Sequence, residues 1–168
     1  MEPLITLIAV TALLLAASAL GVRALRPWPV AVRGGLAAMF VLTGGAHFIG
    51  MREELIAMVP PALPAPGLLV TVTGVLELAG AAALLWRRTA PWSAAGLSVL
   101  LVAMFPANVH LALNGPPTGM VSDELLPRTL MQIVFLAATV SVAAAHRGEL
   151  RLPSGVRKPE SPKPESIG

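Results

Sequence analysis

The sequence has 168 residues, of which 55% are hydrophobic and only 12% are charged. A soluble domain of this size carries roughly 25% charged residues, so most of the surface is expected to face a lipid bilayer. The chain contains no cysteine, which excludes a disulfide, a thiol relay or a cysteine-ligated metal within it. The net charge of +3 comes without a long basic run, so binding of nucleic acid is not predicted.

Five continuous apolar runs predict an all-α membrane protein, a bundle of five transmembrane helices. Each run approaches the ~20 residues that a helix needs to cross a ~30 Å hydrocarbon core, and none alternates as a β-barrel strand would. The second run reaches this length only if the side chain of Arg33 extends to the headgroups. The expected spans are about 3–22, 31–50, 67–86, 92–114 and 128–146.

The two ends of the chain need separate interpretations. Ala17-Ser18-Ala19 is similar to a signal-peptidase site. However, a signal peptide begins with a basic region, whereas this run begins Met1-Glu2-Pro3, and we interpret it as a helix. The bundle is expected to end near residue 147. Residues 148–168 contain too little apolar surface to fold, so a disordered cytoplasmic tail is predicted there.

Lysine and arginine are distributed unequally between the two sides of the predicted bundle. Ten of the twelve fall in segments 23–33, 87–91 and 147–168, which alternate with the loops that hold Arg52 and Arg128. Basic loops stay on the cytoplasmic side of a membrane, so we expect the N-terminus outside and the C-terminus in the cytoplasm. Abundant alanine and scarce lysine suggest a bacterial source, and hence the bacterial plasma membrane.

The loops on the expected outer side carry distinct patterns. Residues 52–59 place Leu55 and Ile56 on one face of a short helix, opposite charged residues, which suits a segment lying on the membrane surface. The proline-rich segment 60–66 has no helical option and is expected to be extended. The loop 114–127 is rich in glycine and proline and is expected to be irregular.

Glu77 is the most informative single residue, because it lies ten residues into an apolar run and therefore near mid-bilayer. An ionised carboxylate there costs roughly 3 kcal/mol on insertion scales, so the side chain is expected to face the bundle interior. We expect it to line a small cavity in the outer half, toward the helices that carry His47 and Asn108. Two roles fit equally well: a protonated side chain that joins helices by hydrogen bonds, or a ligand or proton site.

Other polar residues fall at a comparable depth in the outer half of the expected bundle. Pro106 should bend its helix and leave the carbonyl of Val102 without its helical partner, beside Asn108. Distorted helices next to polar side chains mark binding sites in some transporters, although interhelical hydrogen bonding explains each residue taken singly. No His-x-x-x-His pair is present, and a haem or metal between His47 and His110, although geometrically open, would have only these two ligands, so no metal site is predicted. The candidate ligand-binding residues are Glu77, His47, Asn108, His110, Gln132, Thr73 and Arg128.

Four sequence blocks resemble the DoxX-like family of small bacterial membrane proteins. They are Gly44-Gly45-Ala46-His47-Phe48, Val59-Pro60-Pro61-Ala62-Leu63-Pro64, Thr73-Gly74-Val75-Leu76-Glu77-Leu78-Ala79-Gly80 and Phe105-Pro106-Ala107-Asn108-Val109-His110. The resemblance covers about residues 30–146 and implies a four-helix core, with residues 3–22 as an additional N-terminal helix. The family takes its name from a subunit of a thiosulfate:quinone oxidoreductase. It therefore implies a redox-associated membrane setting, and it supplies no catalytic residues.

Two functions follow as hypotheses. In the first, the bundle is an accessory or redox-associated membrane subunit that holds a quinone-like lipophilic molecule near Glu77, His47 and His110, where an acid and an imidazole can hydrogen-bond its oxygens. In the second, it is a non-catalytic membrane scaffold or assembly protein whose polar residues pack helices and dock a membrane or redox protein partner. The sequence contains no catalytic motif, so enzyme activity is expected at most as a subunit of an oxidoreductase.

Reporter fusions test the predicted orientation. Reporters placed after residues 28, 58, 89, 118 and 155 should indicate cytoplasm, outside, cytoplasm, outside and cytoplasm in turn, because the basic loops stay in the cytoplasm. A cytoplasmic signal from position 58 or 118 would contradict the prediction.

Overall fold

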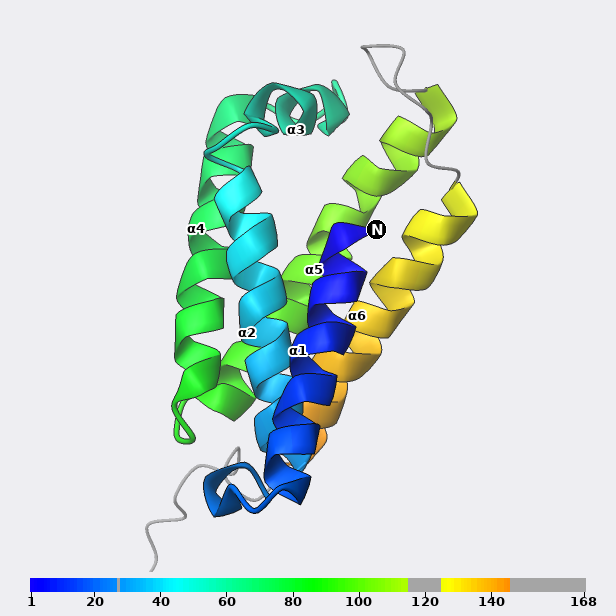
Figure 1. Cartoon of the computed structure of the whole chain (residues 1–168). Coiled ribbons are helices and arrows are strands. Elements are labelled where there is room, and N and C mark those ends of the chain that lie inside the picture. Colours follow the sequence, from blue (N-terminus) through cyan, green and yellow to red (C-terminus); the bar gives the residue numbers. More distant parts are fainter. Residues whose placement is uncertain (27, 115–124, 146–168) are drawn as a thin grey trace, which may run out of the picture.

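The computed structural model describes residues 1–26, 28–114 and 125–145. Within these ranges the chain is all-helical, with six α-helices and one short 3-10 helix (Figure 1). The elements in chain order are α1 (Glu2–Ala19), η1 (Arg23–Leu25), α2 (Trp28–Ala46), α3 (Arg52–Met58), α4 (Pro66–Leu85), α5 (Ala90–Asn114) and α6 (Leu125–Ala145).

Five of the helices, α1, α2, α4, α5 and α6, are long and apolar enough to cross a membrane. Large apolar side chains such as Leu13, Leu85 and Val99 are exposed on their outer faces, as expected where lipid replaces water as the solvent. The prediction of five apolar helices is therefore confirmed, and the architecture indicates a multi-pass membrane protein. The predicted irregular loop 114–127 falls largely, and the predicted disordered tail 148–168 wholly, outside the described residues.

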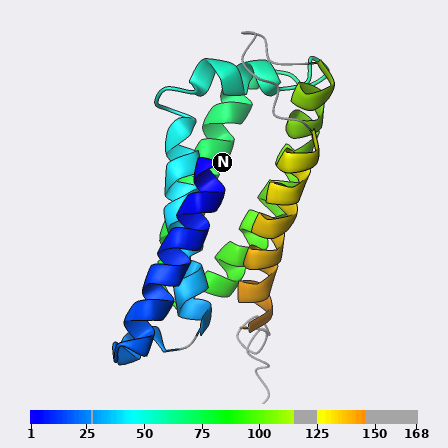
Figure 2. The same cartoon turned by 45° about the vertical axis from the view of Figure 1, so that its right-hand side comes forward.

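The helices pack in the order α1, α2, α4, α5 and α6, and α6 also contacts α2. The buried core is built from α2, α4, α5 and α6, and α1 contributes to it only Leu7 among the described residues. Accordingly, α1 lies on the outside of α2 (Figures 1 and 2). Helix α3 lies across one end of the bundle (Figure 1), and Arg52–Met58 closely matches the short helix predicted for residues 52–59.

Glycines on α2 let two neighbouring helices approach closely. A Cβ atom added to Gly35 would lie 2.0 Å from Oγ1 of Thr11 on α1. A Cβ atom added to Gly44 would lie 3.1 Å from the Cβ of Glu77 on α4. Small residues permit this kind of backbone approach in membrane bundles, so α2 presents one glycine face to α1 and another to α4.

The side chain of Arg33 was expected to reach the headgroups, and this expectation is wrong. Arg33 is buried, with only 6% of its surface exposed. Its Nε donates to the carbonyl of Leu84 and its Nη2 to the carbonyl of Leu85, both at 2.7 Å. These carbonyls end α4, where they have no partner within the helix, and a cation is favoured at that end by the helix dipole. Helix α2 begins at Trp28, so Arg33 lies well inside it.

A second arginine joins α2 to α4 at the other end of the bundle. Helix α2 ends at Ala46, four residues before the expected end of the span, and Gly50 turns the chain with a φ of +81°. The Nη1 of Arg52 donates to the carbonyl of His47 at 3.1 Å. Its Nη2 donates to Oγ1 of Thr71 at 3.0 Å. The end of α2 and the first turns of α4 are therefore held by one guanidinium group.

The proline-rich segment 60–66 was expected to be extended, and this prediction is wrong. The segment instead turns back toward the bundle. The backbone N–H of Leu63 donates to the carbonyl of Pro60 at 2.9 Å, and Ala65 adopts a left-handed conformation with a φ of 51°. Pro66 then begins α4, where its missing N–H leaves no hydrogen bond unmade.

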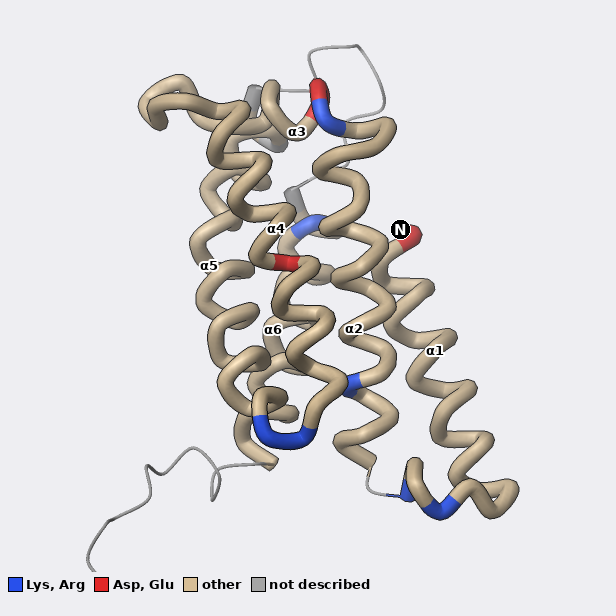
Figure 3. Tube along the Cα trace, turned by 90° about the vertical axis from the view of Figure 1, so that its left-hand side faces the viewer, with Lys and Arg blue, Asp and Glu red and all other residues tan. Residues whose placement is uncertain are grey.

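The basic residues of η1 and of the turn between α4 and α5 lie at the end of the bundle opposite α3 (Figure 3). Helix α3 carries acidic residues as well as Arg52. This distribution is the charge asymmetry on which the predicted orientation rests.

The arrangement of Arg33 generates a stability prediction. Arg33→Met should lower the free energy of unfolding by about 3 kcal/mol, because it removes two charge-assisted hydrogen bonds and leaves carbonyls of α4 without donors. Thermal unfolding in detergent measures this loss. Arg23→Met removes an exposed arginine and is the matched control, with an expected change within about 0.5 kcal/mol. Equal stability of the two variants would contradict the capping role.

Candidate functional site

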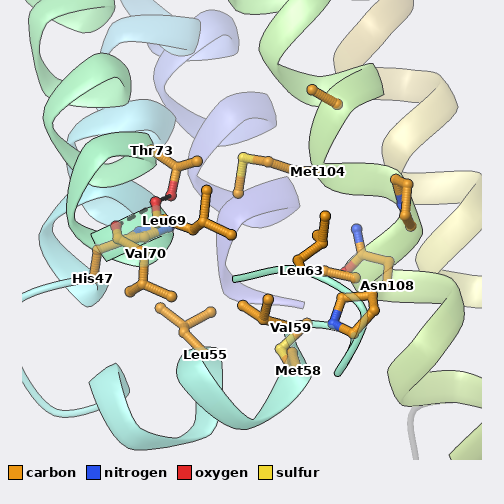
Figure 4. Close-up of a pocket in the computed structure, with 14 residues that line it drawn as sticks. His47, Leu55, Met58, Val59, Leu63, Leu69, Val70, Thr73, Met104 and Asn108 are labelled. Atoms are coloured by element: carbon orange, nitrogen blue, oxygen red, sulfur yellow. Dashed lines mark hydrogen bonds between the residues drawn. The ribbon is translucent and has the colours of Figure 1, made fainter. Parts of the chain in front are cut away.

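A cavity of about 270 Å³ lies at the α3 end of the bundle, between the end of α2, the first half of α4, and α5. Its wall is mostly apolar and includes three polar side chains, His47, Thr73 and Asn108. Figure 4 shows His47 and Asn108 on opposite sides of it. The lining residues are His47, Leu55, Met58, Val59, Pro60, Leu63, Leu69, Val70, Thr73, Ala103, Met104, Pro106, Ala107 and Asn108.

The course of α5 and the segment after α3 create this space. Helix α5 leans away from α4 toward the α3 end (Figures 1 and 2), and Pro106 lies inside it at the height of the cavity. Proline removes a helical hydrogen bond and bends the helix. The turn at Pro60 brings Leu63 into the wall, and Met58, the last residue of α3, also lines it. The end of α3 and the segment that follows it therefore form one side of the cavity.

His47 lies directly after α2 and is 97% buried, with 3% of its surface exposed. Its Nδ1 lies 2.9 Å from the carbonyl oxygen of Thr43. Because a carbonyl can only accept a hydrogen bond, Nδ1 carries the proton. A Cβ atom added to Gly74 would lie 2.6 Å from the Cβ of His47, so only glycine at position 74 leaves room for this histidine.

Glu77 faces the bundle interior, as predicted, with 3% of its surface exposed. The hydroxyl of Thr43 donates to Oε2 of Glu77 at 2.5 Å. Thr43 therefore bonds Glu77 through its side chain and His47 through its backbone. The expectation that Glu77 itself lines the cavity is corrected: the wall contains Thr73, one helical turn away, whereas Glu77 points to α2 at the position where Gly44 allows close approach.

Asn108 and Gln132 form a second polar pair, between α5 and α6. The Nδ2 of Asn108 donates to Oε1 of Gln132 at 3.1 Å, and the Nε2 of Gln132 donates to the carbonyl of Leu101. The bend at Pro106 was expected to free the carbonyl of Val102. The side-chain donor goes instead to the carbonyl one residue earlier, on the stretch of α5 that precedes the bend.

The other predicted site residues take different positions. The hydroxyl of Thr73 donates to backbone carbonyls of its own helix, at 2.9 Å to Leu69 and 3.1 Å to Val70. His110 and Arg128 are half-buried on α5 and α6 and lie outside the cavity wall. The structure thus brings His47, Thr73 and Asn108 to one cavity. Glu77 and Gln132 lie outside its wall, where Glu77 accepts from Thr43 and Gln132 accepts from Asn108. Within the described residues, no group of three His, Asp or Glu side chains is placed to hold a metal.

A family model described as a domain of unknown function, DUF8561, matches residues 36–148. The chain belongs to this family. The matched region starts inside α2, contains the whole cavity, and leaves α1 outside the DUF8561 domain. No curated protein and no solved structure matches the chain.

Two residues of the DUF8561 domain that matter to the site were not predicted from the sequence. Thr43 joins Glu77 to His47, and its position four residues before His47, on the same face of the helix, was the available signal. Gly74 makes room for the imidazole. The sequence indicated only that Gly74 allows close helix packing, because its contact with His47 depends on how α2 and α4 are aligned.

The Thr43–Glu77 bond generates a paired prediction. Glu77→Gln keeps an oxygen that accepts from Thr43, so stability in detergent should be unchanged. Glu77→Leu removes the acceptor and should lower the free energy of unfolding by about 1 kcal/mol, as is typical of interhelical bonds in membranes. Loss of stability in Glu77→Gln equal to that in Glu77→Leu would show that the ionisable proton, and not the acceptor, holds the helices.

Proposed function

We propose that this protein is an accessory or redox-associated membrane subunit that binds a quinone-like lipophilic molecule in the cavity beneath α3. The observation that carries the proposal is the composition of the cavity wall. A space of about 270 Å³ is lined mostly by apolar side chains, and the polar side chains in its wall are His47, Thr73 and Asn108. Ligand sites combine an apolar lining with a small number of placed polar groups in this way. Met58 and Met104 add unbranched side chains, which adapt readily to a ligand's shape.

The setting of the cavity supports the same function. The basic segments at the opposite end favour a cytoplasmic position for that end, and in this orientation the cavity would lie in the outer half of the bundle. The resemblance to the DoxX-like family supports a redox setting, in which the bundle would serve a partner that carries out the electron transfer.

A specific observation favours the alternative function, a non-catalytic membrane scaffold. The hydroxyl of Ser98 on α5 donates to Oγ1 of Thr139 on α6 at 2.8 Å, and Thr43 and Glu77 pair in the same manner between α2 and α4. Such pairs hold transmembrane helices together without any ligand. A scaffold needs no cavity, however, so measurements on the cavity separate the two functions.

Filling the cavity tests the proposal. The purified chain in detergent is titrated with a short-chain prenylated benzoquinone, in its oxidised and its reduced form, by calorimetry. Ala107→Phe places a ring at the cavity wall and should weaken binding at least tenfold, because it occupies the ligand's space. Val99→Phe, at a position of α5 that is 70% exposed, is the matched control and should leave binding unchanged.

Two results would count against this function. If neither form of the probe binds the unmodified protein, the scaffold is favoured. If Ala107→Phe and Val99→Phe bind equally well while both remain folded, the ligand lies elsewhere on the bundle.

A further inference from the structure

The imidazole of His47 reaches the cavity with its hydrogen-bond polarity already fixed. Its Nδ1 is committed as a donor, because its partner is the carbonyl oxygen of Thr43 at 2.9 Å. A neutral imidazole has one donor and one acceptor nitrogen. Since His47 lines the cavity, the ring atom that remains for a ligand is Nε2, and in the neutral ring it is an acceptor.

The amide of Asn108 is fixed by a similar chain of bonds on the opposite wall. The carbonyl of Leu101 can only accept, so the Gln132 atom bonded to it is the donor Nε2. Oε1 of Gln132 is then an acceptor, and its partner on Asn108 must be the donor Nδ2, at 3.1 Å. This leaves Oδ1 of Asn108 as an acceptor for a ligand. A backbone carbonyl thus sets the polarity of each wall.

Thr73 has the same polarity. Its hydroxyl hydrogen is directed to the backbone of its own helix, at 2.9 Å to the carbonyl of Leu69 or 3.1 Å to that of Val70, so toward the cavity its oxygen can only accept. The three polar side chains together offer an acceptor each, and the second amide hydrogen of Asn108 is the one donor that they retain.

From this arrangement we propose that the cavity selects its ligand by hydrogen-bond polarity and takes a lipophilic dihydric phenol in preference to the corresponding dione. A hydroquinone carries a donor hydroxyl at each end of its ring, which suits acceptors on opposite walls. A dione carries acceptors only, so it finds no hydrogen at Nε2 of His47 or at Oδ1 of Asn108 and can accept only from the second amide hydrogen of Asn108. This inference rests on the proposed function and specifies the chemical form that the site holds.

The test uses three probes of one scaffold with the purified full chain in detergent under anaerobic conditions. They are tetramethylhydroquinone, tetramethylbenzoquinone and the dimethyl ether of the hydroquinone, which keeps the ring and loses both donors. The unmodified protein should bind the hydroquinone roughly tenfold more tightly than either of the others, as expected for one or two additional hydrogen bonds.

Variants connect this preference to the named atoms. Asn108→Leu removes the acceptor Oδ1 and should lower the hydroquinone-to-dione ratio several-fold, while the acceptors of His47 and Thr73 remain. Thr73→Val has nearly the same shape, removes one acceptor, and should lower the ratio several-fold; it serves as the test if Asn108→Leu does not fold. Val99→Phe, at an exposed position of α5 outside the cavity wall, is the matched control and should leave the ratio unchanged.

The outcomes are distinguishable. Preference for the hydroquinone that falls in Asn108→Leu or Thr73→Val supports the inference. Equal or tighter binding of the dione by the unmodified protein overturns it while the proposed function stands. A ratio that no variant changes also overturns it, and failure of all three probes to bind overturns the proposed function itself.

Discussion

A backbone carbonyl without a donor is costly wherever water is absent, and this bundle depends on side chains that supply such donors. Arg33, inside α2, donates hydrogen bonds to the last carbonyls of α4. Arg52, at the start of α3, donates to the carbonyl of His47, directly after α2. On α5, Gln132 of α6 adds a side-chain donor to the carbonyl of Leu101, in the stretch of helix that precedes Pro106. Each of these bonds joins two elements, and the two arginines do so where a helix ends, so side-chain donors both satisfy the backbone and hold the bundle together.

The same constraint reaches the cavity and determines its chemistry. The carbonyl of Thr43 accepts a hydrogen bond from Nδ1–H of His47, and the carbonyl of Leu101 orients Gln132 and through it Asn108. Pro106 lies inside α5 and lines the cavity. The polarity of the site is therefore a consequence of how the helices are held together. A change in either carbonyl's partner would alter this polarity without altering any apolar residue of the wall.

The features predicted correctly from the sequence are those that depend on composition over many residues or on a large energy. Five apolar runs, the short helix after residue 51 and the inward direction of Glu77 are of this kind. Two other features were not predicted. The partner of Arg33 lies 51 residues away on α4. Thr73 lines the cavity wall and Glu77 does not, because of how α4 is rotated about its axis. The turn at Pro60 was missed because proline excludes a helix but does not choose between extended and turned backbone. Helix rotation and relative shift are long-range properties, and a single sequence does not encode them in any local pattern.

Packing and binding are often treated as competing roles for a polar residue inside a membrane, but this bundle separates them atom by atom. Ser98 and Thr139 bond to each other and to backbone carbonyls in the interior, and both lie away from the cavity wall, as expected for residues that only join helices. His47 bonds to the helix that it follows and Asn108 bonds to Gln132 on α6, each through one donor, and both residues line the cavity. A hydrogen bond to a neighbouring helix therefore does not argue against a binding role. The role depends on whether a polar atom of the side chain remains free of protein partners, and on whether that atom is a donor or an acceptor.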